Sequence, residues 1–204
     1  MRRTLSICGI ALSLGILACG FIQSVSGADS IQLLSSLMAK IDQAPNVAAS
    51  TKALMKEKLL PFCTDSVFVA AVKAQNSKRL SLDAIKKTDS AWIFADDDLP
   101  IKRELTGNAV TAEIQRLGLR IPSMSEVIVM DNQGANVGQN TLTTDYWQGD
   151  EPKFINAFNS GKGGVDFGKA RLDKSTNRVD QKISLPIIDT DGKVIGAICI
   201  GLVV

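Results

Sequence analysis

Three carboxylates lie close together, at positions 145, 150 and 151, and they are the first candidates for chemistry. Asp145, Asp150 and Glu151 could pair for general acid-base work, or they could grip the ammonium group of an amine or an amino acid. A helix is expected to begin here, so Asp150 is predicted to cap it and Glu151 to lie in its first turn. Asp145 has no such structural role, and we expect it to be the polar anchor of a binding site.

Five aromatic side chains surround the same segment: Tyr146, Trp147, Phe154, Phe158 and Phe167. Large rings where a loop meets a helix and a strand suit the wall of an apolar pocket. Phe154 and Phe158 are predicted to belong to the core. Tyr146 and Trp147 each carry a polar group and lie in a loop rich in Thr, Asp and Gln, where binding sites are commonly placed. These two rings could line a ligand site or fill the core.

Two cations follow in the next predicted strand. Lys169 and Arg171 are expected on the same face of that strand as Val165 and Phe167. A cation on the inner face of a sheet is costly to bury without an anion. If that face lines a pocket, the planar guanidinium of Arg171 is the natural partner for a ligand carboxylate. If the strand lies at a sheet edge, Arg171 is a solvated residue that guards the edge.

The composition excludes several classes of chemistry. The sequence has no histidine, which removes Ser-His-Asp and Cys-His catalysis and the commonest metal ligand. It contains no nucleophile-elbow, Ser-x-x-Lys or phosphate-loop signature. Two acidic runs resemble calcium ligands only superficially, because residues 189–192 are predicted to form a hairpin turn and residues 96–98 a solvated loop. We therefore expect no catalytic residue, no metal site and no cofactor.

Residues 1–27 have the pattern of a secretory signal peptide. Arg2 and Arg3 precede an uncharged apolar run over residues 5–22, and small residues close the segment. Cleavage after Gly27 removes two of the 23 basic residues and leaves 21, equal to the 21 acidic residues. A neutral chain without a basic cluster offers no electrostatic footprint for nucleic acid or anionic lipid. An uncleaved membrane anchor is the alternative, because the apolar run is about long enough to span a bilayer.

Export also bears on the cysteines. Cys8 and Cys19 are removed with the signal peptide. The alternative is a lipid anchor on Cys19, but the residues before Cys19 match a lipidation motif poorly. Cys63 and Cys199 remain in an oxidising compartment, where a bridge between them is permitted. Because Cys199 falls inside an apolar strand pattern, where a free thiol behaves as a small hydrophobe, we expect the two to be buried and unpaired.

Residues 28–120 show helical periodicity. Apolar residues recur at spacings of three and four over residues 31–41, up to Pro45. Further helices are predicted over residues 46–60 (ended by Pro61), 66–74, 81–88 (capped by Ser81) and from 106 or 108 to Gly118.

Residues 121–204 change to a period of two, which is typical of an antiparallel sheet. Five strands are predicted, over residues 126–131, 136–140, 165–172, 178–188 and 193–204, with a helix over residues 151–159 between the second and third. Asp191-Gly192 is a strong hairpin signal, so the last two strands are expected to pair. Their predicted core residues are Ile183, Leu185, Ile198 and Ile200.

Three stretches of this half resemble the PDC-type sensor domains, also called Cache domains: residues 126–140, 143–154 and 183–197. The second contains Asp-Tyr-Trp-Gln-Gly-Asp-Glu, and the third follows the pattern Pro-x-x-Asp-x-x-Gly-x-x-x-Gly. The resemblance implies an α+β fold over residues 28–204, with a PAS-like five-stranded antiparallel sheet and an N-terminal helical layer. It also implies a pocket lined by the loop and helix that follow the second strand.

The sequence thus predicts an exported, soluble domain, periplasmic or secreted, that binds a small molecule in extracytoplasmic sensing and catalyses no reaction. The predicted ligand-binding residues are Asp145, Tyr146, Trp147, Lys169 and Arg171. The alternative is the same domain with a filled pocket, acting as an interaction module for a membrane-bound signalling protein such as a histidine kinase or chemoreceptor. A third hypothesis is a carboxylate-dependent hydrolase that uses Asp145 with Asp150 or Glu151.

Overall fold

The computed structural model describes residues 26–96, 99–173 and 178–203. The expected signal peptide over residues 1–27 lies almost wholly outside these ranges. Among the helices of the described ranges, none has the length and apolarity needed to cross a membrane.

The first half of the chain is helical, as predicted. Its helices are α1 (Ser26–Gln43), α2 (Ala49–Leu54), α3 (Ser66–Ser77), α4 (Leu82–Phe94), α5 (Pro100–Leu105) and α6 (Ala109–Gly118). Three of them begin at a side chain that accepts a backbone N–H of the first turn, namely Asp65 for α3, Ser81 for α4 and Asn108 for α6.

Two helical predictions are wrong. Pro61 does not end the second helix, because α2 continues into a π-helical turn (Met55–Leu59) and a 3-10 turn (Leu60–Thr64). Pro61 stands in the first turn of the latter, where its missing N–H is not needed. The helix expected over residues 81–88 is longer than predicted, because α4 runs to Phe94. Pro100 then begins α5, which was not predicted. Of the acidic residues 96–98, only Asp96 is among those described, and it is exposed.

The second half forms one antiparallel sheet. Its strands are β1 (Met124–Met130), β2 (Asn136–Gln139), β3 (Asp166–Phe167), β4 (Arg171–Asp173), β5 (Arg178–Ile188) and β6 (Val194–Val203), with α7 (Pro152–Phe158) and a short 3-10 turn (Asn159–Gly161) between β2 and β3. The strand order is β2-β1-β6-β5-β3, and β4 also pairs with β5. This arrangement confirms the PAS-like α+β fold. The predicted third strand is broken into β3 and β4, so the sheet has six strand segments where five were expected.

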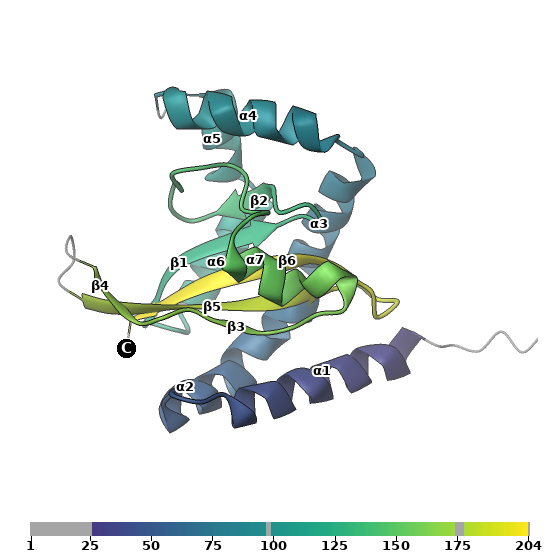
Figure 1. Cartoon of the computed structure of the whole chain (residues 1–204), viewed down its shortest axis with the longest axis vertical. Coiled ribbons are helices and arrows are strands. Elements are labelled where there is room, and N and C mark those ends of the chain that lie inside the picture. The colour runs from purple at the N-terminus through teal and green to yellow at the C-terminus, as the bar shows by residue number, and fades with distance from the viewer. Residues whose placement is uncertain (1–25, 97–98, 174–177, 204) are drawn as a thin grey trace, which may run out of the picture.

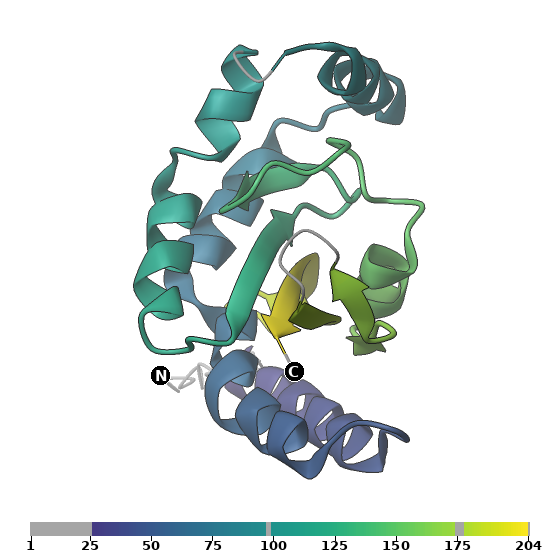
Figure 2. The same cartoon turned by 90° about the vertical axis from the view of Figure 1, so that its left-hand side faces the viewer.

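Helices cover both faces of the sheet (Figures 1 and 2). Figure 2 shows α3 and α6 on one side of the sheet and α7 on the other, and Figure 1 shows α1 and α2 below it and α4 above it. The main core lies on the α3 side. The four residues predicted there, Ile183, Leu185, Ile198 and Ile200, are all 0% exposed. The β5–β6 hairpin around Asp191-Gly192 is confirmed as well.

The two cysteines are free and buried, which confirms the expected state of Cys63 and Cys199. Burial raises the pKa of the Cys63 thiol to about 12, and it also raises that of Cys199. Neither thiol is therefore a ready nucleophile at neutral pH.

The C-terminal end of α3 contacts both hairpin turns of the sheet, the β1–β2 turn and the β5–β6 turn. Asn76 Nδ2 donates to the Ile195 carbonyl at 2.8 Å, beside the β5–β6 turn, and Asn76 Oδ1 accepts from the backbone N–H of Asn132 in the β1–β2 turn at 3.1 Å. Lys73 adds an ion pair of 3.8 Å with Asp189, which is itself an acceptor for backbone N–H groups of the β5–β6 turn. The hairpins therefore keep a fixed position relative to each other.

Gly196 is required where β6 passes β1 and α3. A Cβ at this position would lie 2.3 Å from the Met130 carbonyl oxygen and 3.0 Å from a Val72 methyl group. Gly196→Ala should lower the free energy of unfolding by roughly 1 to 3 kcal/mol, because a backbone oxygen in a central strand cannot move aside. Gly118→Ala is the matched control, because its Cβ would meet only the flexible end of Met124, at 3.4 Å. Urea denaturation of both variants measures the effect, and equal stabilities would contradict it.

Asp131 gives a pH-dependent test of the β1–β2 turn. One carboxylate oxygen accepts the N–H groups of Gln133 at 2.8 Å and Ala135 at 3.0 Å, while burial of the carboxyl raises its pKa. A raised pKa means that the folded state prefers the neutral carboxyl, so stability falls as the pH rises from the unfolded-state value of roughly 4 through the folded value.

Asp131→Asn keeps an oxygen acceptor and cannot ionise. Its stability should match the wild type at low pH and equal or exceed it as the pH rises through this window. Asp131→Ala, which leaves two N–H groups unpaired, should be less stable throughout, by roughly 1 to 3 kcal/mol. The free energy of unfolding of each variant would be measured by denaturation between pH 3 and pH 8, roughly the span around these pKa values. A free energy of unfolding of Asp131→Asn that fell relative to the wild type as the pH rose would contradict the account.

Candidate functional site

The face of the sheet turned toward α7, called the α7 face below, carries a row of paired residues. Gln139 on β2 lies opposite Ile128 on β1, Ile128 opposite Cys199 on β6, and Cys199 opposite Ser184 on β5. Residues that lie opposite each other in a sheet point to the same face, so these four share it. Phe154 of α7 closes over the row, in one buried cluster with Ile128 and Cys199.

Four buried side chains on or beside this face have a polar atom without a strong hydrogen-bond partner. Asn136 Oδ1, Gln139 Nε2 and Gln148 Oε1 find none among the described residues, Ser184 Oγ has only the Cys199 thiol beside it, and these residues are at most 1% exposed. Each such atom costs roughly 1 to 3 kcal/mol, and folded proteins contain few of them. Three of them, Asn136, Gln139 and Gln148, are linked to one another at the β2 end of this face, whereas Ser184 lies three strands away on β5.

Asp145 contacts two of these residues, Asn136 and Gln148. Its backbone oxygen accepts from Asn136 Nδ2 at 3.3 Å, from Thr143 Oγ1 at 2.6 Å and from Gln148 Nε2 at 3.0 Å. Its carboxylate also accepts from Gln148 Nε2 at 2.6 Å. Asn136 Nδ2 in turn donates to Gln139 Oε1 at 3.0 Å. The half-buried Asp145 therefore lies at the polar cluster, as a binding anchor would.

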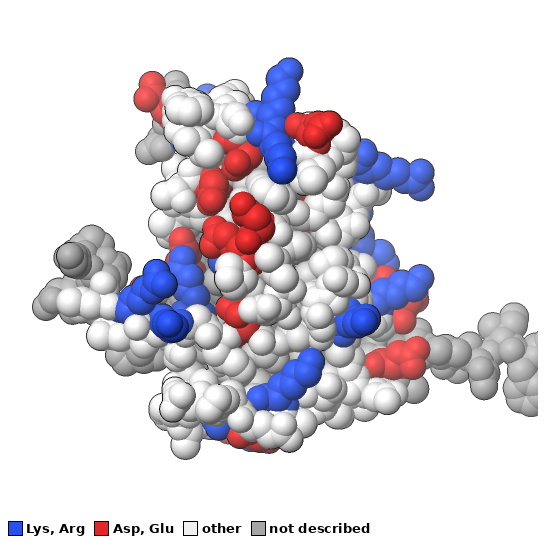
Figure 3. All heavy atoms as spheres, viewed as in Figure 1, with Lys and Arg blue, Asp and Glu red and all other residues white. Residues whose placement is uncertain are grey.

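Two ion pairs flank the row. Lys182 Nζ lies 2.5 Å from Glu126 across β5 and β1, and Lys153 Nζ lies 3.1 Å from Glu151 on α7. Burial lowers the pKa of Lys182, but the pair with Glu126 outweighs it and leaves that pKa raised. A hydrogen bond with the Ser184 hydroxyl and, after it, the charges of Lys153 and Lys182 act to lower the pKa of the Cys199 thiol, against the larger effect of burial. Charges of both signs thus adjoin the buried row, and Figure 3 shows acidic side chains gathered over the segment between β2 and α7.

Tyr146 lies away from the row, in a small apolar cluster with Trp92 and Ala135. Its ring centroid is 6.0 Å from that of Trp92, its hydroxyl accepts from Gln75 Nε2 at 3.3 Å, and burial raises its pKa to about 12. Trp147 is half-buried, donates its indole N–H to the Gln133 carbonyl at 2.8 Å and has the Lys86 ammonium 4.8 Å from its ring centroid. A ligand contact for either ring stays a prediction.

Helix α4 holds the segment that carries these residues. Asp89 Oδ1 accepts the backbone N–H groups of Tyr146 at 2.8 Å and Trp147 at 3.0 Å, and Trp92 Nε1 donates to the Thr143 carbonyl at 2.9 Å. The connection between β2 and α7 is thereby held beside the start of β2, at the edge of the sheet, where Trp147 pairs with Ala135, although it has almost no regular structure of its own.

Lys169 and Arg171 lie at the other edge of the sheet, because β2 and β3 are its two ends. The expectation that they share one face with Val165 and Phe167 is wrong for Arg171. Phe167 pairs with Ile183 and Arg171 with Asp180, so the pairing shifts by one residue across the break at residues 168–170. A shift of one residue exchanges the faces, and Arg171 therefore lies on the α7 face side while Phe167 lies on the core side. Lys169 and Arg171 are both exposed.

The predicted cap of α7 is also wrong. Glu151, rather than Asp150, is the N-cap residue, and its side chain makes no cap hydrogen bond. Pro152 begins the helix and has no N–H of its own to satisfy, which reduces the need for a cap. Asp150 is exposed, and Glu151 pairs with Lys153 as described above.

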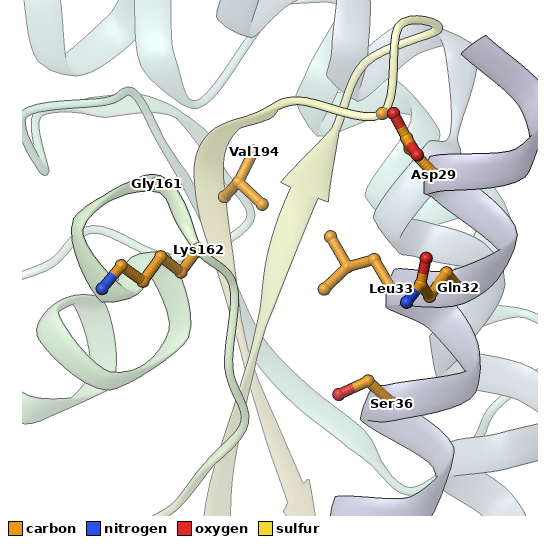
Figure 4. Close-up of a pocket in the computed structure, with 8 residues that line it drawn as sticks. Asp29, Gln32, Leu33, Ser36, Gly161, Lys162 and Val194 are labelled. Atoms are coloured by element: carbon orange, nitrogen blue, oxygen red, sulfur yellow. The ribbon is translucent and has the colours of Figure 1, made fainter. Parts of the chain in front are cut away.

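Two of the grooves in the described part of the chain bear on the predicted site residues. The first has a volume of about 320 Å³ and lies between α1 and the loop after α7, where Leu33 and Val194 face each other (Figure 4). The second, of about 480 Å³, lies between residues 45–51 and the β3–β4 break. Neither groove is lined by Asp145, Tyr146 or Trp147.

Several residues of the α7 face were not singled out from the sequence as site residues. They are Glu126, Asn136, Gln139, Gln148, Lys153, Lys182 and Ser184. The one available signal was the alternation along β5, which places Lys182 and Ser184 opposite to the core residues. This alternation does not predict which element packs on the face that carries Lys182 and Ser184.

Comparison with known proteins gives similarity in structure but not in sequence. No family model matches the chain, and no curated protein matches it. The sensor domain of the Vibrio cholerae histidine kinase DctB is similar with a TM-score of 0.39 and 16% identity, over 84% of this chain and 56% of that domain.

Two chemoreceptor domains are similar as well. The ligand-binding domain of Campylobacter jejuni Tlp3, in complex with 4-methylisoleucine, gives a TM-score of 0.38 and 13% identity, over 89% of this chain and 61% of that domain. The ligand-binding domain of the Pseudomonas aeruginosa amino acid chemoreceptor PctC, in complex with GABA, gives a TM-score of 0.34 and 11% identity, over 68% of this chain and 58% of that domain. The chain spans less than two thirds of each solved domain. The solved structures that it resembles are thus sensor and ligand-binding domains.

Proposed function

We propose that this chain is an extracytoplasmic sensor domain that binds a small polar molecule on the α7 face of its sheet. The observation that carries the proposal is the set of unpaired polar atoms of Asn136, Gln139 and Gln148, which lie together at the β2 end of the α7 face, with Ser184 buried farther along the same face on β5. A ligand that forms hydrogen bonds with these atoms removes the free-energy penalty of leaving them buried and unpaired in the free protein.

The charges around the row indicate the kind of ligand. The carboxylate of Asp145 suits an ammonium group, and the ion pairs Glu126–Lys182 and Glu151–Lys153 would each have to open for a ligand carboxylate or ammonium group to replace one partner. A small zwitterion such as an amino acid presents both. The proposed role is binding without chemical change, with export through the segment 1–27 and a membrane-bound signalling protein as the partner that reads the bound state.

The anchoring role of Asp145 can be tested against a matched carboxylate in the same segment. Residues 28–204 would be screened by thermal shift against amino acids, amines and organic acids, and the best ligand measured by calorimetry. Asp145→Asn should weaken binding by roughly 1.5 to 3 kcal/mol, the value of a hydrogen bond to a charged group. Asp150→Asn removes the same charge from an exposed side chain and should leave the affinity unchanged. Equal effects of the two variants would refute the anchor.

Ser184 tests the site itself through opposite effects on stability and binding. Because the buried Ser184 hydroxyl has only the Cys199 thiol, a weak hydrogen-bond partner, beside it, Ser184→Ala should raise the free energy of unfolding of the free protein, by roughly 1 kcal/mol or less, while it reduces the stabilisation by ligand.

The control is Thr111→Val, which removes a buried hydroxyl that donates to the carbonyls of Leu105 and Gln139 at 3.0 Å each. It should lower stability and leave the ligand response of the folded protein intact. A Ser184→Ala variant that is destabilised and binds normally would show that Ser184 is an ordinary structural residue.

A further inference from the structure

The groove at the β3 edge has features of a second binding site, separate from the α7 face. It is lined on one side by the connection between α1 and α2, residues 45–51, and on the other by residues 167–170 with Gln181 of β5. Gln181 lies on the same side of β5 as the core residue Ile183, so the groove opens on the core side of the sheet. Its volume of about 480 Å³ is within the range typical of small-molecule sites.

The groove is largely apolar, with Asn46, Thr51 and Gln181 as its uncharged polar side chains and Lys169 as its one cation. Pro45, Val47, Ala48 and Phe167 contribute hydrocarbon surface. Among the described residues that line the groove, Lys169 is the one with a charged side chain, and it forms no ion pair within the described part of the chain. Figure 3 shows other basic side chains gathered over β4 and the adjoining end of β5. The electrostatic environment therefore favours an anion.

The apolar surface continues beyond the groove. Leu172 on β4 pairs with Val179 on β5, on the same side of the sheet as Gln181, and these two side chains are 55% and 38% exposed. Figure 1 shows this end of the β4–β5 ribbon projecting past the helices. An adjacent pair of exposed aliphatic side chains at the mouth of an apolar groove extends the surface that a hydrocarbon chain could cover.

The break that opens the groove is fixed by local contacts. Gly168 donates its N–H to the Lys182 carbonyl at 2.8 Å, and its own carbonyl accepts from Gln181 Nε2 at 3.0 Å. A Cβ on Gly168 would lie 2.9 Å from the same Lys182 oxygen. The chain can approach β5 this closely only with glycine, and the one-residue shift that follows leaves Lys169 at the rim of the groove.

We propose that this groove binds an aliphatic carboxylate, with the hydrocarbon chain against Val47 and Phe167 and toward Leu172 and Val179, and with the carboxylate at Lys169. The site does not depend on the proposed function of the α7 face. The ligand is held by burial of apolar area and is oriented by one charge at the rim.

The test is a titration of residues 28–204 with decanoate, below its micelle concentration, followed by calorimetry and by NMR shifts of Phe167 and Val179. Decanoate should bind and shift these signals, whereas acetate, which lacks the chain, and decylammonium, which reverses the charge, should bind at least several-fold more weakly. Because Lys169 is exposed, Lys169→Gln should weaken decanoate binding by only about two- to fivefold. Lys162→Gln, at the other groove, is the matched control and should have no effect.

The chain-binding surface has its own matched pair. Leu172→Ser should weaken decanoate binding, whereas Leu119→Ser, at an exposed site outside the groove, should not. Three results would overturn the proposal: decylammonium binding as tightly as decanoate, equal losses from the two leucine variants, or Val179 signals that respond to protein concentration instead of decanoate. The last would show that a second copy of the chain covers this surface. Each of these outcomes leaves the α7 face, tested through Asp145 and Ser184, unaffected.

Discussion

The alternation of side chains along β5 and β6 is the constraint on which the rest of this structure depends. These two strands lie in the middle of the sheet, and their register places Ile183 opposite Ile200 and Ser184 opposite Cys199. Burial of one large aliphatic side chain is worth roughly 1.5 to 3 kcal/mol, so a slip of one residue would expose several of them and bury Lys182 in the core. The turn at residues 189–192 and the contacts from Lys73 and Asn76 prevent that slip.

The same alternation produces the candidate site. Once the aliphatic residues of β5 and β6 face α3, their neighbours must face α7, and those neighbours include Ser184 and Lys182. Helix α7 then closes over this face with Phe154 and Ala157, so polar groups become buried together with apolar ones. The unpaired atoms of this face lower the stability of the free protein. This cost is typical of a binding site, where the free state retains hydrogen-bonding groups for a ligand.

The sequence was sufficient for most of the fold, because the signals there are local. Period-two alternation, the Asp191-Gly192 dipeptide and the caps at Ser81 and Asn108 act over a few residues, and each formed as expected. The break at Gly168 has no such signal, because it depends on a contact with Lys182 on another strand. That single-residue shift moved Arg171 to the opposite face from the one expected.

The site was harder to predict for the same reason. The partners of the β2–α7 connection come from distant positions, such as Asp89 for the backbone of Tyr146 and Trp147 and Gln75 for the Tyr146 hydroxyl. Asp145 was predicted as an anchor because it lacked a local role; it lies beside Asn136 and Gln148, and its binding role stays a prediction. Gln139 and Gln148 could not be identified, because an amide in a strand or a loop becomes notable only when its surroundings leave one of its atoms unpaired.

The central claim is that the α7 face is where a ligand binds, and hydrogen-deuterium exchange with and without the best ligand from the screen tests it most directly. The account predicts slower exchange over residues 136–158, which include β2, the connection and α7, and along the middle of β5 and β6. Slower exchange confined to α1, α4 or the β3–β4 edge, with residues 136–158 unchanged under saturating ligand, would contradict it.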